Sequence, residues 1–132
     1  KSFVISDIPG LIAGASEGVG LGIQFLKHLS RTRAILTIID VEDKLAEEIK
    51  EETEELIKEL KNFDEELVAK AKWIVLNKID LLSQEDINFL VQTTKDLEKE
   101  FSIHAISAKN RIGTEELVKE VGFYLENLNE EI

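Results

Sequence analysis

Apolar residues along this chain gather in short runs, and polar segments separate them. Four runs are short and rich in β-branched residues, which is typical of strands, and they cover residues 3–7, 34–40, 73–76 and 103–106. The run at 34–40 is apolar almost throughout, so we expect a strand that is buried on both faces.

Between these runs, apolar residues recur every three or four positions, which predicts amphipathic helices. A short helix is expected at 23–29, a long acidic helix at 45–67, a helix from an N-cap at Ser83 to residue 101, and a last helix at 117–128. Their expected buried stripes are Ile23, Phe25, Leu26 and Leu29, then Leu45, Ile49, Leu56, Leu60, Phe63 and Leu67, then Ile87, Leu90, Val91, Leu97 and Phe101, then Leu117, Val118, Val121, Tyr124, Leu125 and Leu128. Strands that alternate with helices predict an α/β fold, with a parallel sheet flanked by helices on both faces.

The composition is that of a soluble globular protein with one domain, because 43% of its 132 residues are hydrophobic and 33% are charged. The chain has no cysteine, which excludes disulfides, thiolate metal sites and a cysteine nucleophile. No apolar run approaches the roughly 20 residues needed to cross a bilayer, so we expect no membrane-spanning segment and a cytoplasmic location.

The net charge of −11 argues against a nucleic-acid-binding surface on this chain, because phosphate contacts need clustered lysines and arginines. Any nucleic-acid partner would therefore be contacted by another part of the protein. The sequence contains no methionine and opens directly in a strand pattern after Lys1. We therefore expect the chain to be a fragment of a longer protein.

Three polar stretches each follow a predicted strand directly, and they cover 7–10, 77–80 and 107–109. Parallel strands share one carboxyl edge, where ligands bind in open α/β sheets, so these stretches should converge there. The N-K-x-D pattern at 77–80 combines an amide, a long aliphatic stem with a charge, and a carboxylate. A carboxylate suits a planar pair of donors, such as the ring N–H and the amine on the edge of guanine.

The three stretches resemble the D-x-x-G, N-K-x-D and S-A-K motifs of the translation-factor-type P-loop GTPases. A glycine-rich loop at 8–22, followed by F-L-K-H-L at 25–29 and R-T-R at 31–33, narrows the resemblance to the Obg family. The resemblance covers essentially the whole chain. It implies that residues 1–132 are a single partial GTPase (G) domain in which 8–22 is the switch II loop, with GTP or GDP as the ligand and Mg²⁺ as the cofactor.

The resemblance implies a set of nucleotide-binding residues across the three motifs. They are Asp7, Ile8, Pro9, Gly10, Asn77, Lys78, Ile79, Asp80, Ser107, Ala108 and Lys109. On the phosphate side, Asp7 would hold Mg²⁺ through the water shell of the ion, and the Gly10 N–H would approach the terminal phosphate. No catalytic side chain is assigned, because Leu11 follows Gly10 where many GTPases place a glutamine that orients the attacking water. The Obg family has an apolar residue at the same place, so we expect slow hydrolysis.

The resemblance also implies how the base would be held. Asp80 would accept the two guanine donors, and the Ala108 N–H would donate to the guanine carbonyl oxygen, which discriminates against the amine of adenine. Asn77 would brace the neighbouring loops and the base. The aliphatic stem of Lys78 would cover the base plane.

No G-x-x-x-x-G-K-[ST] motif occurs in the 132 residues. In the family this phosphate-binding loop precedes the strand at 3–7, together with a strand that lies centrally in the sheet. We therefore expect it roughly 50 residues before Lys1. Without this loop, half of the phosphate site is missing, so this chain alone should bind GTP weakly or not at all. The strands of its sheet could also pair differently, because the strand at 3–7 has lost its native neighbour.

The resemblance implies a molecular switch in which the terminal phosphate orders the switch II loop. It also implies a role in the assembly of the large ribosomal subunit and in growth control. Contacts to RNA would then come from other domains, in keeping with the acidic charge of this chain.

Two other functions stay open. A dinucleotide-binding unit could use Gly18, Gly20 and Gly22, with Asp40 as the ribose-binding acid about 20 residues later. Against it, Ile23 occupies the last small-residue position of that motif, and the glycines lie well beyond the end of the first strand. Alternatively, a non-enzymatic module with a degenerate nucleotide site could recruit partners through its acidic helix and glycine-rich loop.

Overall fold

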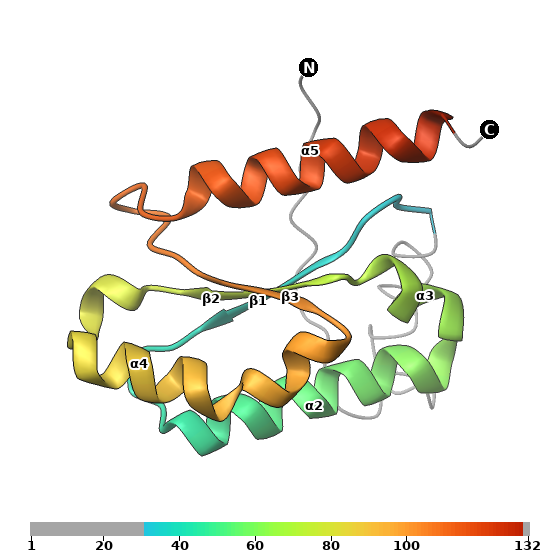
Figure 1. Cartoon of the computed structure of the whole chain (residues 1–132). Helices are drawn as coiled ribbons and strands as arrows, with labels where there is room; N and C mark the ends of the chain where they lie inside the picture. Colours follow the sequence, from blue (N-terminus) through green and yellow to red (C-terminus); the bar gives the residue numbers. More distant parts are fainter. Residues whose placement is uncertain (1–30, 131–132) are drawn as a thin grey trace.

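A computed structural model describes residues 31–130, which form a three-stranded parallel sheet with helices on both faces (Figure 1). The strands are β1 (Leu36–Asp40), β2 (Trp73–Asn77) and β3 (Ser102–Ala105). They lie in the order β1-β2-β3, and the predicted fold class is confirmed. Residues 1–30 lie outside the described part of the chain, and with them the predicted strand at 3–7, the glycine-rich loop at 8–22 that we expect to be switch II, and the helix predicted at 23–29.

The helices of the described part of the chain divide between the two faces of the sheet. They are α2 (Ala46–Phe63), α3 (Glu65–Lys70) and α4 (Gln84–Thr93), the 3₁₀ helices η2 (Ile79–Leu81) and η3 (Lys95–Lys99), and α5 (Thr114–Glu130). α2 and α4 lie on one face, and α5 lies on the other (Figure 1). None of these described helices is both long enough and apolar enough to span a membrane.

β2 is the centre of the fold, because it has a strand on each side and helices above and below. Its residues alternate between two cores, as the two-residue period of a strand requires. Trp73 and Val75 pack with α5, whereas Ile74 and Leu76 pack with α2 and α4. Trp73 also meets the edge of the Tyr124 ring, with the ring centroids 5.1 Å apart.

β1 is less buried than its sequence predicts. Ile39 is 2% exposed in the core with α2 and α4, whereas Ile38 is 58% exposed on the opposite face. The core with α5 reaches Leu36 but does not include Ile38, because β1 is at the edge of the described sheet. The expectation of a strand buried on both faces is therefore wrong for this part of the structure.

The long helix predicted at 45–67 is two helices, α2 and α3, which are separated at Asp64. The backbone of Asp64 is extended, with φ −166° and ψ 121°, and its side chain accepts the Glu66 N–H at 2.9 Å. An aspartate in this position caps a new helix, so local capping overrides the continuous apolar stripe. Leu45 is 71% exposed, because it precedes α2 as its N-cap residue and lies outside the stripe.

α4 begins as predicted, because Ser83 Oγ accepts the Asp86 N–H at 3.1 Å. The helix ends early, at Thr93, and η3 takes the place of its predicted last turns. The predicted buried stripes of the last two helices include Val91 and Val118, but these residues are 37% and 48% exposed. Each helix buries a narrow stripe, and these valines lie beside it.

Candidate functional site

The two polar stretches that the structure describes lie together at the carboxyl edge of the sheet. The Ile79 N–H donates to the Ile106 carbonyl at 3.1 Å. The Ala108 N–H donates to Asn77 Oδ1, also at 3.1 Å. The N-K-x-D and S-A-K stretches are therefore in direct contact, whereas the D-x-x-G stretch at 7–10 lies outside the described residues.

The side chain of Asn77 connects the ends of all three strands. Its Nδ2 donates to Asp40 Oδ1 at 3.3 Å, where β1 ends, and its Oδ1 accepts the Ala108 N–H that follows β3. Its backbone carbonyl accepts the Val41 N–H at 3.0 Å. A carboxylate can only accept and a backbone N–H can only donate, so these two partners determine the orientation of the Asn77 amide.

Lys78 has a left-handed backbone, with φ 72° and ψ 32°, which is uncommon for a residue with a side chain. Its Nζ lies 2.9 Å from Glu42 Oε1 and 3.2 Å from Asp40 Oδ2. The hydrogen bond to Glu42, and after it the one to Asp40, raises the pKa of Lys78 above the ordinary value of 10.5. Because this pKa is raised, the stabilisation from the ion pair is present below pH 10.5 and is lost only as the pH rises through the higher value.

The carboxylate of Asp80 is exposed in the first turn of η2. Within residues 31–130 it has no hydrogen-bond or ion-pair partner, unlike the side chains of Asn77 and Lys78. The hydrogen bond between Ile79 and Ile106 holds the backbone beside it. Asp80 therefore offers both carboxylate oxygens to a ligand with two parallel donors.

The loop after β3 is a closed turn. Ser107 is fully buried and exchanges two backbone hydrogen bonds with Ile112, each of 3.0 Å. Gly113 closes the turn with φ 73°, and a Cβ at this position would lie 3.0 Å from a backbone carbonyl oxygen of β3. The turn leaves Ala108 and Lys109 exposed at the site.

The donor that the family resemblance assigns to guanine is already in use. The Ala108 N–H donates to Asn77 Oδ1, so a guanine carbonyl oxygen would have to share this N–H or replace Asn77. Because Ala108 is exposed, a ligand can reach its N–H in either case. The role that the resemblance assigns to Ala108 would therefore depend on Asn77 as well.

Asp40 and Glu42 are site residues that the sequence did not indicate in this role. The sequence suggested Asp40 only as a ribose-binding acid, and it suggested no role for Glu42. In the structure the two oxygens of Asp40 contact Asn77 and Lys78, which takes up the carboxylate that a ribose would need. The glycines of the dinucleotide alternative lie outside the described residues. The signal available in the sequence was an acid at the end of the strand next to the motif.

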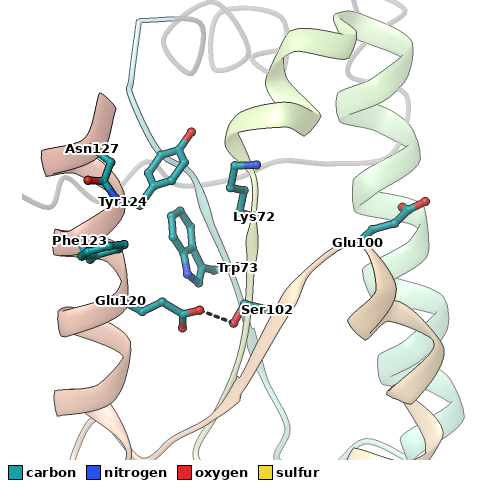
Figure 2. A pocket seen from close by; sticks show the side chains of 8 residues that line it. All are labelled: Lys72, Trp73, Glu100, Ser102, Glu120, Phe123, Tyr124 and Asn127. Atoms are coloured by element: carbon teal, nitrogen blue, oxygen red, sulfur yellow. Dashed lines mark hydrogen bonds between the residues drawn. The ribbon is translucent and has the colours of Figure 1, made fainter. Parts of the chain in front are cut away.

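A shallow hollow of about 520 Å³ lies at the opposite, amino edge of the sheet (Figure 2). It is lined by Lys72, Trp73, Glu100, Ser102, Glu120, Phe123, Tyr124 and Asn127. Ser102 Oγ lies 2.9 Å from Glu120 Oε1 and 3.2 Å from His104 Nε2, which brings together the residue types of a hydrolytic triad. His104 contacts both partners through the same nitrogen, Nε2, whereas a triad needs one ring nitrogen for the serine and the other for the acid. The group is therefore not arranged for nucleophilic catalysis.

Within residues 31–130 no group of three or more histidine, aspartate or glutamate side chains is placed to hold a metal ion. The resemblance assigns Mg²⁺ to Asp7, which lies outside the described residues. The described part of the site therefore contains the stretches that the resemblance assigns to the base, whereas the stretch that it assigns to the phosphates lies outside the described residues.

Comparison with protein-family models gives a match over residues 1–78, to a family described as 50S ribosome-binding GTPase. The match covers more than half of the 132 residues. It extends from the D-x-x-G stretch through β1 to Asn77 and Lys78, the two residues whose side chains contact Asp40.

Proposed function

The chain belongs to the family of 50S ribosome-binding GTPases, and on this basis we propose that it carries the guanine pocket of a GTP-hydrolysing molecular switch of Obg type. Membership of a GTPase family makes guanine nucleotides the ligand class. The observation that carries the proposal is the exposed carboxylate of Asp80, which has no partner within residues 31–130. It lies at the sheet edge where Ala108 donates a hydrogen bond to Asn77.

The pocket would select the base by its hydrogen-bond pattern. Guanine presents a ring N–H and an amine on one edge, and Asp80 can accept both, whereas adenine lacks this donor pair. The Ala108 N–H favours a carbonyl at the adjacent position of the ring. The stem of Lys78, whose ammonium group is held by Glu42, would lie over the base plane.

The phosphate side of the proposal rests on residues 7–11. Asp7 would hold Mg²⁺ through water, and the ion would offset charge on the phosphates during transfer. The Gly10 N–H would contact the terminal phosphate. Leu11 has no group to orient a water, so we expect slow turnover by the natural protein.

The large ribosomal subunit is the proposed partner, since the family description names the 50S particle. With a net charge of −11, this chain is poorly suited to bind RNA directly. Contacts to the subunit would come from other parts of the protein, in the cytoplasm, and the proposed role is in subunit assembly and growth control.

The test of the guanine pocket is Asp80→Asn in the natural protein. The change removes a charged acceptor of two hydrogen bonds, so GDP affinity should fall by at least about 100-fold. The asparagine amide can instead donate to the carbonyl that xanthine has in place of the guanine amine. Xanthosine diphosphate should therefore bind the variant more tightly than it binds the wild type, as measured by isothermal titration calorimetry.

The matched control is Asp86→Asn, which changes an exposed aspartate in the first turn of α4, outside the site. It should leave GDP affinity unchanged. Equal GDP affinity in Asp80→Asn and the wild type would overturn the proposal. Phosphate release from GTP by the wild type separates a GTPase from a partner-recruiting module, and thermal protection by NAD in place of GDP would favour the dinucleotide alternative.

A further inference from the structure

Two acids at the end of β1 hold the first half of the N-K-x-D stretch in place. We propose that Asp40 and Glu42 are positioning residues of the guanine pocket. Glu42 holds the Lys78 stem over the base, and Asp40 fixes the position of the Lys78 ammonium group and the orientation of the Asn77 amide. The inference rests on the proposed function, and it adds the part of the pocket that β1 supplies.

The case for Asp40 is that its two carboxylate oxygens contact two consecutive residues. Its Oδ1 accepts from Asn77 Nδ2 at 3.3 Å, and its Oδ2 lies 3.2 Å from Lys78 Nζ. The contact with Asn77 follows from the sheet register, which places Asp40 and Asn77 opposite each other. Because Asp40 can only accept, it turns the Asn77 carbonyl oxygen toward Ala108, the residue assigned to the guanine carbonyl.

The case for Glu42 is that it forms the shorter contact of Lys78, at 2.9 Å. The left-handed backbone of Lys78 sets the direction in which its side chain leaves the loop. Glu42 then fixes the charged end, so the aliphatic stem between these two points has few conformations left. A stem that is ordered in advance loses less entropy when a base packs on it.

The exposure of the three charged side chains predicts that their ion pairs affect nucleotide binding more than folding stability. The side chains of Lys78, Asp40 and Glu42 are 38%, 47% and 46% exposed. Ion pairs this exposed contribute little to folding stability, because water screens them. Loss of Glu42 should therefore change nucleotide affinity while the melting temperature stays close to that of the wild type.

The experiment measures GDP and IDP affinities of the natural protein by calorimetry, for the wild type, Glu42→Gln and Asp40→Asn. Glu42→Gln should weaken both nucleotides by about two- to fivefold, and Asp40→Asn, which acts on two residues, by about fivefold to tenfold. IDP lacks the guanine amine, so the ratio of GDP to IDP affinity reports on Asp80. This ratio should stay unchanged in both variants, because neither contacts Asp80.

The matched control is Glu52→Gln, which breaks the pair between Lys44 and Glu52 outside the site. That pair is 2.8 Å long, with side chains 34% and 42% exposed, so it is chemically similar to the pair of Lys78 and Glu42. Glu52→Gln should leave both affinities unchanged. A loss equal to that of Glu42→Gln would overturn the inference, because it would show a general effect of surface charge.

Two further readouts separate positioning from a merely structural role. In a Lys78→Met background, Glu42→Gln should cause no further loss, since Glu42 acts through the Lys78 ammonium group. The difference between Glu42→Gln and the wild type should also shrink as salt rises from about 0.1 M to about 1 M, where the screening length falls from about 10 Å to about 3 Å.

The outcomes distinguish failure of the inference from failure of the proposed function. Wild-type affinity in Glu42→Gln, or losses that add in the Lys78→Met background, would overturn the inference alone if Asp80→Asn still abolishes the preference for GDP over IDP. A wild-type protein that binds neither nucleotide would overturn both. A loss of affinity in Glu42→Gln that comes with a lower melting temperature and a changed GDP to IDP ratio would assign Glu42 a structural role and overturn the inference.

Discussion

Single backbone conformations shape the turn after β3. Gly113 and Arg111 both have left-handed φ values, of 73° and 57°. Glycine adopts this conformation without steric cost, and residues with a Cβ do not. At Gly113 a Cβ would also lie 3.0 Å from the Ala105 carbonyl oxygen and 3.2 Å from Ile106 Cγ2. Ala108 lies in the same turn, so this glycine helps to place the N–H that the proposed pocket would use.

Gly113→Ala should destabilise the natural protein by about 1–3 kcal/mol, because alanine is forced into a left-handed conformation against backbone atoms. The control is Arg111→Gly at the neighbouring left-handed position. There, relief of strain and greater freedom of the unfolded chain oppose each other, so the change should stay within about 0.5 kcal/mol. Urea unfolding measures both, and equal stability of the two variants would contradict this account of the turn.

At the scale of elements, capping decides where the acidic helical segment divides. The apolar stripe alone would allow one helix across α2 and α3, but Asp64 leaves the helical conformation and caps α3. The division lets α3 end at Lys70, whose carbonyl accepts the Ile35 N–H at 3.1 Å just before β1. The position of this short helix is therefore tied to the strand that carries Asp40.

Asp64→Ala should cost about 0.5–2 kcal/mol of stability, because the Glu66 N–H loses its acceptor at the start of α3. Asp64→Ser keeps a side-chain oxygen at the same place and should retain most of the stability. Urea unfolding of the natural protein measures the difference. If serine were as destabilising as alanine, the capping explanation for the division would be wrong.

At the scale of the whole molecule, the described residues form the base side of the proposed pocket. Asp40, the N-K-x-D stretch and the turn after β3 meet at one edge of the sheet, held from below and above by two cores. The other requirement of nucleotide binding is a cradle for the phosphates, and no phosphate-loop motif occurs in the 132 residues. In the resembling family, the strand that carries this loop pairs beside the strand equivalent to β1.

The chain of residues 1–132 on its own should therefore bind GTP weakly or not at all. A phosphate loop contributes backbone N–H groups and a lysine to the most highly charged part of the ligand, and the base contacts cannot replace them. Calorimetry on the isolated chain, beside the natural protein as control, measures the difference. A micromolar affinity of the isolated chain would contradict this prediction.

The sequence alone was sufficient for the parts of the molecule that depend on local chemistry. β1, β2 and β3 begin and end within one or two residues of the predicted runs, because short β-branched runs bounded by polar segments favour strands. Ser83 caps α4 as predicted, since the cap and its partner are three residues apart. The convergence of the N-K-x-D and S-A-K stretches also followed, because parallel strands share their carboxyl edge.

Only the tertiary structure decided which distant residues become partners. Glu42 lies 36 residues from Lys78, and Asp40 lies 37 residues from Asn77. The end of the strand marks Asp40 as an acid near the motif, but nothing in the local pattern predicts which side chains either acid contacts. Ile38 has the apolar character of a core residue, yet it is exposed, because β1 lies at the edge of the described sheet and the core with α5 does not extend over it. A residue's type and periodicity are local properties, whereas its partners and burial depend on register and on how the helices pack over the sheet.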